Sequence, residues 1–121
     1  MPDAPRARPG NHTMLRSFAG HVRARPKAVF EAIDRRFRPP DGSRILYTAD
    51  PAAFLIIIQG HWWYRGEFRV VPDEKGSHIE HYILNVAETA HRLGPVVGRR
   101  ALKQEPVAFE RLLRQLRAEL E

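Results

Sequence analysis

The stretch HWWYRGEFRVVPDEKGSHIEHYILNVAE, residues 61–88, decides how this chain folds. Both of its halves are rich in aromatic and β-branched residues, which strands favour. Between them, PDEKG (72–76) combines proline, acidic residues and glycine, which turns prefer. If DEKG (73–76) forms the loop, Pro72 faces Ser77. The stretch therefore predicts an antiparallel hairpin.

The pairing of these two strands sorts their side chains onto two faces. In this register Phe68 lies opposite His81, and Arg69 lies opposite Glu80, an opposite-charge pair that stabilises a sheet. A shift by one residue would set the charged row of one strand beside the apolar row of the other. The face predicted to point inward carries Trp62, Tyr64, Phe68, Val70, Ile79, His81, Ile83 and Asn85. The face predicted to point outward carries Trp63, Arg65, Glu67, Arg69, Glu80, Tyr82 and Leu84, with its charges solvated.

The residues before the hairpin predict three strands and one helix. SFAGHVRARP (17–26) alternates with a period of two, as a half-buried strand does. PKAVFEAIDRRF (26–37) has helical spacing, begins with proline and ends before PPDG (39–42). SRILYTAD (43–50) predicts a strand, and AAFLIIIQG (52–60) predicts another that is covered on both faces.

The residues after the hairpin predict a C-terminal helix. The segment 89–100 contains Gly94, Pro95 and Gly98, so we expect it to be irregular or to form one short helix. From Pro106 onward, apolar residues recur on one helical stripe. That stripe consists of Phe109, Leu112, Leu113, Leu116 and Leu120.

The order of these elements predicts an α+β helix-grip fold, a curved antiparallel β-sheet wrapped around a long C-terminal α-helix. Gly66, which lacks a side chain, allows the sheet to curve or leaves space inside it. With 121 residues the chain is long enough for one domain, predicted over residues 14–121. Residues 1–13, rich in proline and arginine, are expected to form a disordered tail.

Composition narrows the classes of function. There is no cysteine, so neither a disulfide nor a thiolate site is available. No apolar run approaches the ~20 residues that span a bilayer, and no signal peptide is evident, so we expect a cytoplasmic protein without membrane insertion. The net charge of +6 comes from arginines scattered along the chain, so nucleic acid is not an expected partner.

The chain resembles the START-like superfamily, also called the polyketide cyclase/dehydrase and lipid-transport group. HVRARPKAVFEAI (21–33) resembles its opening strand and helix. GHWWYRGEFRVVP (60–72) and GSHIEHYILNVAE (76–88) resemble the late strands of its small bacterial members. The resemblance covers about residues 17–121 and implies a cavity between sheet and final helix that holds lipids, polyketides or other hydrophobic molecules. This chain has fewer predicted strands than fuller members and no second helix after Phe37, which implies a smaller or more open cavity, or none.

The leading hypothesis is a module that binds a small hydrophobic or aromatic molecule, without a cofactor. Large rings with a few polar tips are typical of such cavities. Tyr64, His81 and Asn85 would orient the ligand by hydrogen bonds; alternatively, His81 and Asn85 satisfy each other, water or nearby backbone. The predicted ligand-binding residues are Trp62, Tyr64, Phe68, His81, Ile83 and Asn85, with Tyr47, Phe109 and Phe30 as weaker candidates.

Two further hypotheses stay open. A cyclase- or dehydratase-type enzyme would use His81 as acid or base, and it would need a carboxylate partner, for which Asp34 and Glu31 are candidates. A partner-binding protein with a collapsed cavity is the other. Trp63 and Tyr82 on the outer face suggest a homodimer. The six histidines form no helical pair and no acidic cluster accompanies them, so we expect no metal site.

Overall fold

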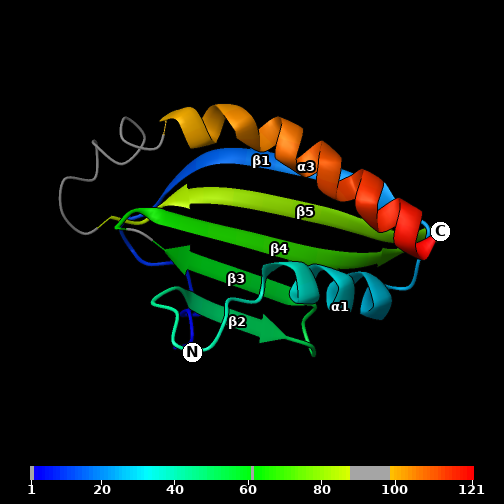
Figure 1. Ribbon diagram of the computed structural model, residues 1–121, viewed down its shortest axis with the longest axis horizontal. Helices are drawn as coiled ribbons and strands as arrows, with labels where there is room; N and C mark the ends of the chain where they lie inside the picture. Colours follow the sequence, from blue (N-terminus) through cyan, green and yellow to red (C-terminus); the bar gives the residue numbers. More distant parts are fainter. Residues whose placement is uncertain (1, 61, 88–98) are drawn as a thin grey trace.

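The computed structural model describes residues 2–60, 62–87 and 99–121. Within these residues the chain forms one five-stranded antiparallel sheet with strand order β1-β5-β4-β3-β2. The strands are β1 (Thr13–Val22), β2 (Leu46–Asp50), β3 (Leu55–Gly60), β4 (Tyr64–Asp73) and β5 (Gly76–Asn85). The helices are α1 (Pro26–Phe37) and α3 (Arg99–Leu120). Because β1 and β2 lie at opposite edges, the connection through α1 carries the chain across the sheet (Figure 1).

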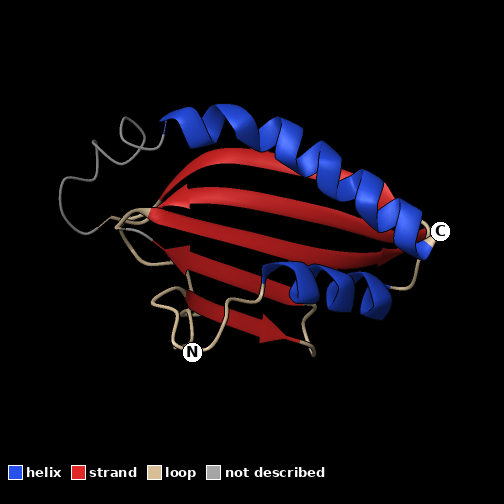
Figure 2. Ribbon diagram, in the orientation of Figure 1, coloured by secondary structure: helices blue, strands red, loops and turns tan. Residues whose placement is uncertain are grey.

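Helices α1 and α3 both lie on the concave face of the sheet, α3 along β1 and α1 across β3 and β4 (Figure 2). This arrangement confirms the predicted α+β helix-grip fold. Gly20 lets α3 approach β1 closely, since a Cβ at this position would lie 2.5 Å from Cδ1 of Leu113. The core between the layers consists of Val22, Val29, Phe30, Ala32, Ile33, Tyr47, Ile56, Phe68, Val70, Ile79, Phe109, Leu112, Leu113 and Leu116.

The two helices agree with the sequence to different degrees. Helix α1 has the predicted bounds, with a proline in its first turn. Helix α3 begins at Arg99, so the prediction that it starts at Pro106 was wrong. Pro106, at which the predicted apolar stripe begins, lies inside the helix, and the buried Leu102 continues that stripe toward the N-terminus. The segment 89–100, predicted to be irregular or to form one short helix, lies outside the described part of the chain except for Arg99 and Arg100, which belong to α3.

The register of the central hairpin is confirmed along its whole length. Strand β4 pairs with β5 from Tyr64 opposite Asn85 to Asp73 opposite Gly76. The two tryptophans before β4 do not continue its alternation, because residues 62–63 form a turn. Trp62 is 44% exposed and Trp63 only 5%, the reverse of the prediction. Trp63 packs inside the protein against Ile83, Ala87 and Leu102.

The N-terminal segment 2–12, expected to be disordered, lies against the outer face of the sheet, and we call it the strap. Its carbonyl groups accept hydrogen bonds from the sheet: Pro2 from the Tyr47 N–H and Ala4 from the Thr48 hydroxyl. Ala4 itself is buried in an apolar cluster. The strap thereby covers the outer face of β3, which agrees with the predicted burial of that strand on both sides. The other members of this cluster are Leu46, Leu55 and Ile57.

The strap also corrects the prediction that Arg65 and Glu67 are solvated. Both point outward, yet Arg65 is 0% and Glu67 6% exposed, because the strap covers them. Arg65 donates to Glu67 at 2.9 Å and to the carbonyl oxygens of Pro5 and Arg6. Arg8 pairs with Glu67 at 2.8 Å from the other side. The outer face therefore contains an Arg65–Glu67–Arg8 network in which Arg65 and Glu67 are buried and Arg8 is partly exposed.

Candidate functional site

A cavity of about 250 Å³ lies between the sheet and the two helices. Its lining comes from the end of α1, from β3, β4 and β5, and from residues 105–112 of α3. The collapsed-cavity hypothesis requires an interior that is fully packed with side chains, and this cavity does not fit that requirement. The described residues that line the cavity are Phe37, Ile58, Tyr64, Phe68, His81, Glu105, Ala108, Phe109 and Leu112.

His81 is held in one orientation on the wall of this cavity. Its ring stacks on Phe68 with centroids 4.0 Å apart and an interplanar angle of 6°. Its Nδ1 lies 3.0 Å from the carbonyl oxygen of Glu67. A carbonyl can only accept, so Nδ1 carries the proton and Nε2 is left as an acceptor. Burial lowers the pKa of His81 to about 4, although the hydrogen bond to the Glu67 carbonyl and the charge of the Glu67 carboxylate act in the opposite direction. The ring is therefore neutral at neutral pH.

Glu105 on α3 supplies the carboxylate that the enzyme hypothesis lacked. Its Oε2 lies 4.0 Å from Nε2 of His81, and burial raises the pKa of Glu105. The two carboxylates suggested by the sequence do not take this place. Asp34 accepts a hydrogen bond from the Tyr47 hydroxyl at 2.6 Å and pairs with Arg38, and Glu31 is exposed.

Tyr64 lies beside the same pair. Its ring occupies the space that Gly66 leaves, since a Cβ on Gly66 would lie 2.6 Å from the Tyr64 hydroxyl. The space expected at Gly66 is therefore filled by this ring. Burial, and then the charge of Glu105, raise the pKa of Tyr64, so its hydroxyl stays protonated and can donate a hydrogen bond to a ligand.

The structure brings four of the predicted site residues to the cavity, namely Tyr64, Phe68, His81 and Phe109. The others lie elsewhere. Trp62 is largely exposed, so its prediction as an interior wall was wrong. Ile83 packs against Trp63, and the Asn85 side chain accepts a hydrogen bond from the Ala87 N–H at 3.1 Å. Tyr47 bonds to Asp34, and Phe30 lies in the main core.

Sequence reasoning missed five lining residues, and one of them had a usable signal. Glu105 precedes Phe109 by one helical turn and therefore shares its face. Starting the helix at Pro106 removed Glu105 from consideration. The remaining four are Phe37, Ile58, Ala108 and Leu112. Leu112 belongs to the predicted apolar stripe of the helix, but whether it and the other three line the cavity depends on how the helices cross the sheet.

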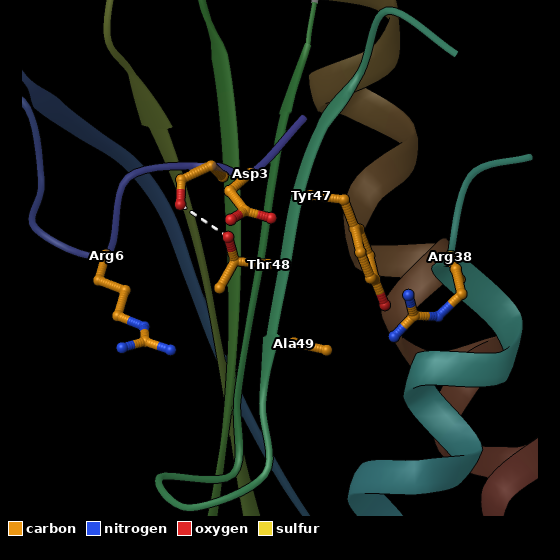
Figure 3. A pocket seen from close by; sticks show the side chains of 7 residues that line it. Asp3, Arg6, Arg38, Tyr47, Thr48 and Ala49 are labelled. Atoms are coloured by element: carbon orange, nitrogen blue, oxygen red, sulfur yellow. Dashed lines mark hydrogen bonds between the residues drawn. The ribbon is translucent and has the colours of Figure 1, made fainter. Parts of the chain in front are cut away.

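A second hollow of about 460 Å³ lies around the edge strand β2. Figure 3 shows Tyr47 and Arg38 on one side of this strand, and Asp3 and Arg6 on the other. Its two arginines already have partners, since Arg38 pairs with Asp34 at 2.9 Å and Arg6 with Asp50 at 3.5 Å. The strand divides this hollow, which makes the inner cavity the better candidate site.

Among the residues that the structure describes, no group of three or more histidine and acidic side chains is placed to hold a metal ion. None of the described helices is both long and apolar enough to cross a membrane. Comparison of the chain with protein-family models, curated proteins and solved structures found no match. The START-like resemblance and the cytoplasmic location stay predictions.

Proposed function

We propose that this protein binds a small, mostly apolar molecule in the inner cavity. The observation that carries the proposal is an apolar cavity with a few polar groups that converge on one side, as in small-molecule sites. Phenylalanine rings from α1, β4 and α3 form its walls. His81, Tyr64 and Glu105 provide the polar side, which would orient a ligand.

The cavity volume limits the size of that molecule. An apolar cavity of about 150 Å³ accommodates benzene, and pockets for drug-sized ligands start at about 300 Å³. A cavity of about 250 Å³ therefore suits a molecule of one or two rings. Among the molecules that the START-like resemblance implies, this volume favours short or monocyclic ones over long lipid chains.

Filling the cavity should weaken this binding strongly. Ala108 lines the cavity from α3 and is exposed, so Ala108→Trp places an indole at the site without replacing a core residue. We expect indole and 1-naphthol to raise the melting temperature of the wild type, and the variant to bind them at least about tenfold more weakly. Ala118→Trp, an exposed position nearer the end of the same helix, is the matched control. Equal binding by wild type and Ala108→Trp would place the ligand elsewhere.

Native mass spectrometry of the purified protein would show whether a molecule co-purifies and would identify it. A defined compound that is present in the wild type and in Ala118→Trp, and absent from Ala108→Trp, is the expected result. A protein that carries no compound and shows no melting-temperature shift with either probe would overturn the proposal.

A second candidate function, acid–base catalysis, is favoured by the distance of 4.0 Å between Glu105 and His81. This function requires Glu105 in its protonated form, which burial favours, and not as the charged carboxylate. Nε2 of His81 would accept a proton from a carbon next to a carbonyl, and protonated Glu105 would give its proton to the carbonyl oxygen, which yields the enol. We expect the protein to accelerate hydrogen–deuterium exchange of 2-indanone in D₂O, followed by NMR. Glu105→Gln should slow this exchange by about 10²-fold. Exchange no faster than in buffer would exclude this chemistry for that ketone class.

A further inference from the structure

Two acceptors lie on the polar side of the cavity beside the Tyr64 hydroxyl, namely the Glu105 carboxylate and Nε2 of His81. No lysine or arginine is among the described residues that line it. Glu105 makes no side-chain hydrogen bond with any described residue. Its closest ion-pair contact with a described residue is the 4.0 Å approach of its Oε2 to Nε2 of His81. Its side chain is only 22% exposed. A mostly buried, ionised carboxylate with no cation among the described residues is costly, so a cationic ligand would stabilise it.

The geometry of the two acceptors indicates the kind of partner. Oε2 of Glu105 and Nε2 of His81 are 4.0 Å apart, and the Nδ1–H bond to Glu67 leaves Nε2 without a proton. A single nitrogen can lie at about 2.9 Å from both atoms and donate one hydrogen to each. Hydroxyl groups have one hydrogen and satisfy only one acceptor, whereas an ammonium group has three donors.

The remainder of the lining suits an organic body attached to such a group. Phe37, Phe68, Phe109 and Tyr64 present aromatic side chains around the same space. Aromatic surfaces attract ammonium groups through their quadrupole and pack against the apolar part of the molecule. The negative charge of Glu105, conversely, disfavours a ligand that is a carboxylate.

We propose that the ligand of this cavity is a small organic amine, whose ammonium group donates to Glu105 and His81 while its apolar body contacts the aromatic walls. This inference rests on the proposed binding function and names its ligand class. It excludes free fatty acids and aromatic acids as preferred ligands.

Three probes that differ mainly in the polar group test this class: benzylamine, benzyl alcohol and benzoate. Binding to the full chain at neutral pH is followed by NMR titration and calorimetry. Because a charge-assisted hydrogen bond is stronger than a neutral one, we expect benzylamine to bind about tenfold more tightly than benzyl alcohol, and benzoate to bind most weakly. Glu105→Gln should remove the preference for the amine and leave the affinity for the alcohol within about threefold. Glu110→Gln, on the exposed side of the same helix, should keep the preference.

The outcomes separate this inference from the binding function beneath it. If benzyl alcohol or benzoate binds in the cavity as tightly as the amine, the ligand class is wrong and the binding function stands. A preference for the amine that persists in Glu105→Gln also overturns the inference, because the ammonium would then lie elsewhere. If none of the three probes binds although indole or 1-naphthol does, the inference fails and the binding function stands; if none of the five compounds binds, both fail.

Discussion

Replacing Glu67 by alanine is expected to lower the free energy of unfolding by about 3–5 kcal/mol, the usual effect of removing one partner of a buried ion pair. Arg65 is completely buried on the outer face of β4, and Glu67 is its counter-ion at 2.9 Å. Without that carboxylate, the Arg65 guanidinium would retain only neutral acceptors, the carbonyl groups of Pro5 and Arg6 and the side chain of Gln59.

The same substitution should also loosen the strap. Arg8 is bound to Glu67 through both Nε and Nη2, and this is the ion pair that fastens residues 2–12 near the middle of the sheet. Burial raises the pKa of Glu67, but the hydrogen bonds and charges of Arg8 and Arg65 outweigh it and hold the pKa below its ordinary value. The carboxylate is therefore charged at neutral pH, and its removal leaves two unneutralised arginines.

Urea unfolding at neutral pH measures this effect. Glu110→Ala, an exposed glutamate on α3, is the control and should change stability by no more than about 0.5 kcal/mol. Arg8→Ala should cost about 1 kcal/mol, since Arg8 is partly exposed and can be replaced by water. A Glu67→Ala variant that unfolds within about 1 kcal/mol of the wild type would show that the network adds little to stability.

The parts of the fold that local patterns determine were predictable. The β4–β5 register follows from a short loop and from the need to bury one face of each strand, so Phe68 opposite His81 could be derived from the sequence. The bounds of α1 follow from its proline and its spacing. The alternation failed at Trp62 and Trp63 because it applies only within a strand, and the strand begins at Tyr64.

The parts that depend on distant segments were not predictable. Arg65 has the sequence pattern of a solvated strand residue, and its burial comes from a strap that is 59 and 60 positions away in the chain. Glu105 approaches His81 only because α3 crosses the sheet at that point. The sequence thus indicated four of the nine lining residues, those on the hairpin and Phe109, and it did not indicate the carboxylate of Glu105.

Acid is expected to destabilise the protein between pH 6.5 and 4 through His81. In the folded state burial lowers its pKa from the ordinary 6.5 to about 4, with the Glu67 carbonyl bond acting in the opposite direction. As the pH falls through this window, the unfolded chain takes up a proton that the folded chain refuses, so stability decreases. The full difference corresponds to about 3 kcal/mol. Below pH 4 the folded state is also protonated, and His81 causes no further loss.

His81→Phe tests this expectation, because phenylalanine preserves a ring against Phe68 and cannot titrate. The readout is the change in unfolding free energy between pH 7.5 and pH 4.5, so a constant loss of stability in the variant does not affect it. We expect this change to be smaller in His81→Phe than in the wild type by about 2–3 kcal/mol. His78→Gln, on the outer face of the same strand, is the control and should retain most of the wild-type dependence.

The pKa of Glu67 is held below its ordinary value, so carboxylates of this kind stop stabilising the folded state only as the pH falls below about 4.5. Their effect on stability therefore lies mostly at lower pH than the range from 6.5 to 4 in which His81 acts. Parallel curves for the wild type and His81→Phe would mean that Nε2 accepts a proton readily in the folded state. The neutral acceptor beside Glu105, on which the recognition of an amine depends, would then be absent. The pH dependence of folding and the ligand class of the cavity are thus two consequences of one feature, the unprotonated Nε2 of a buried histidine.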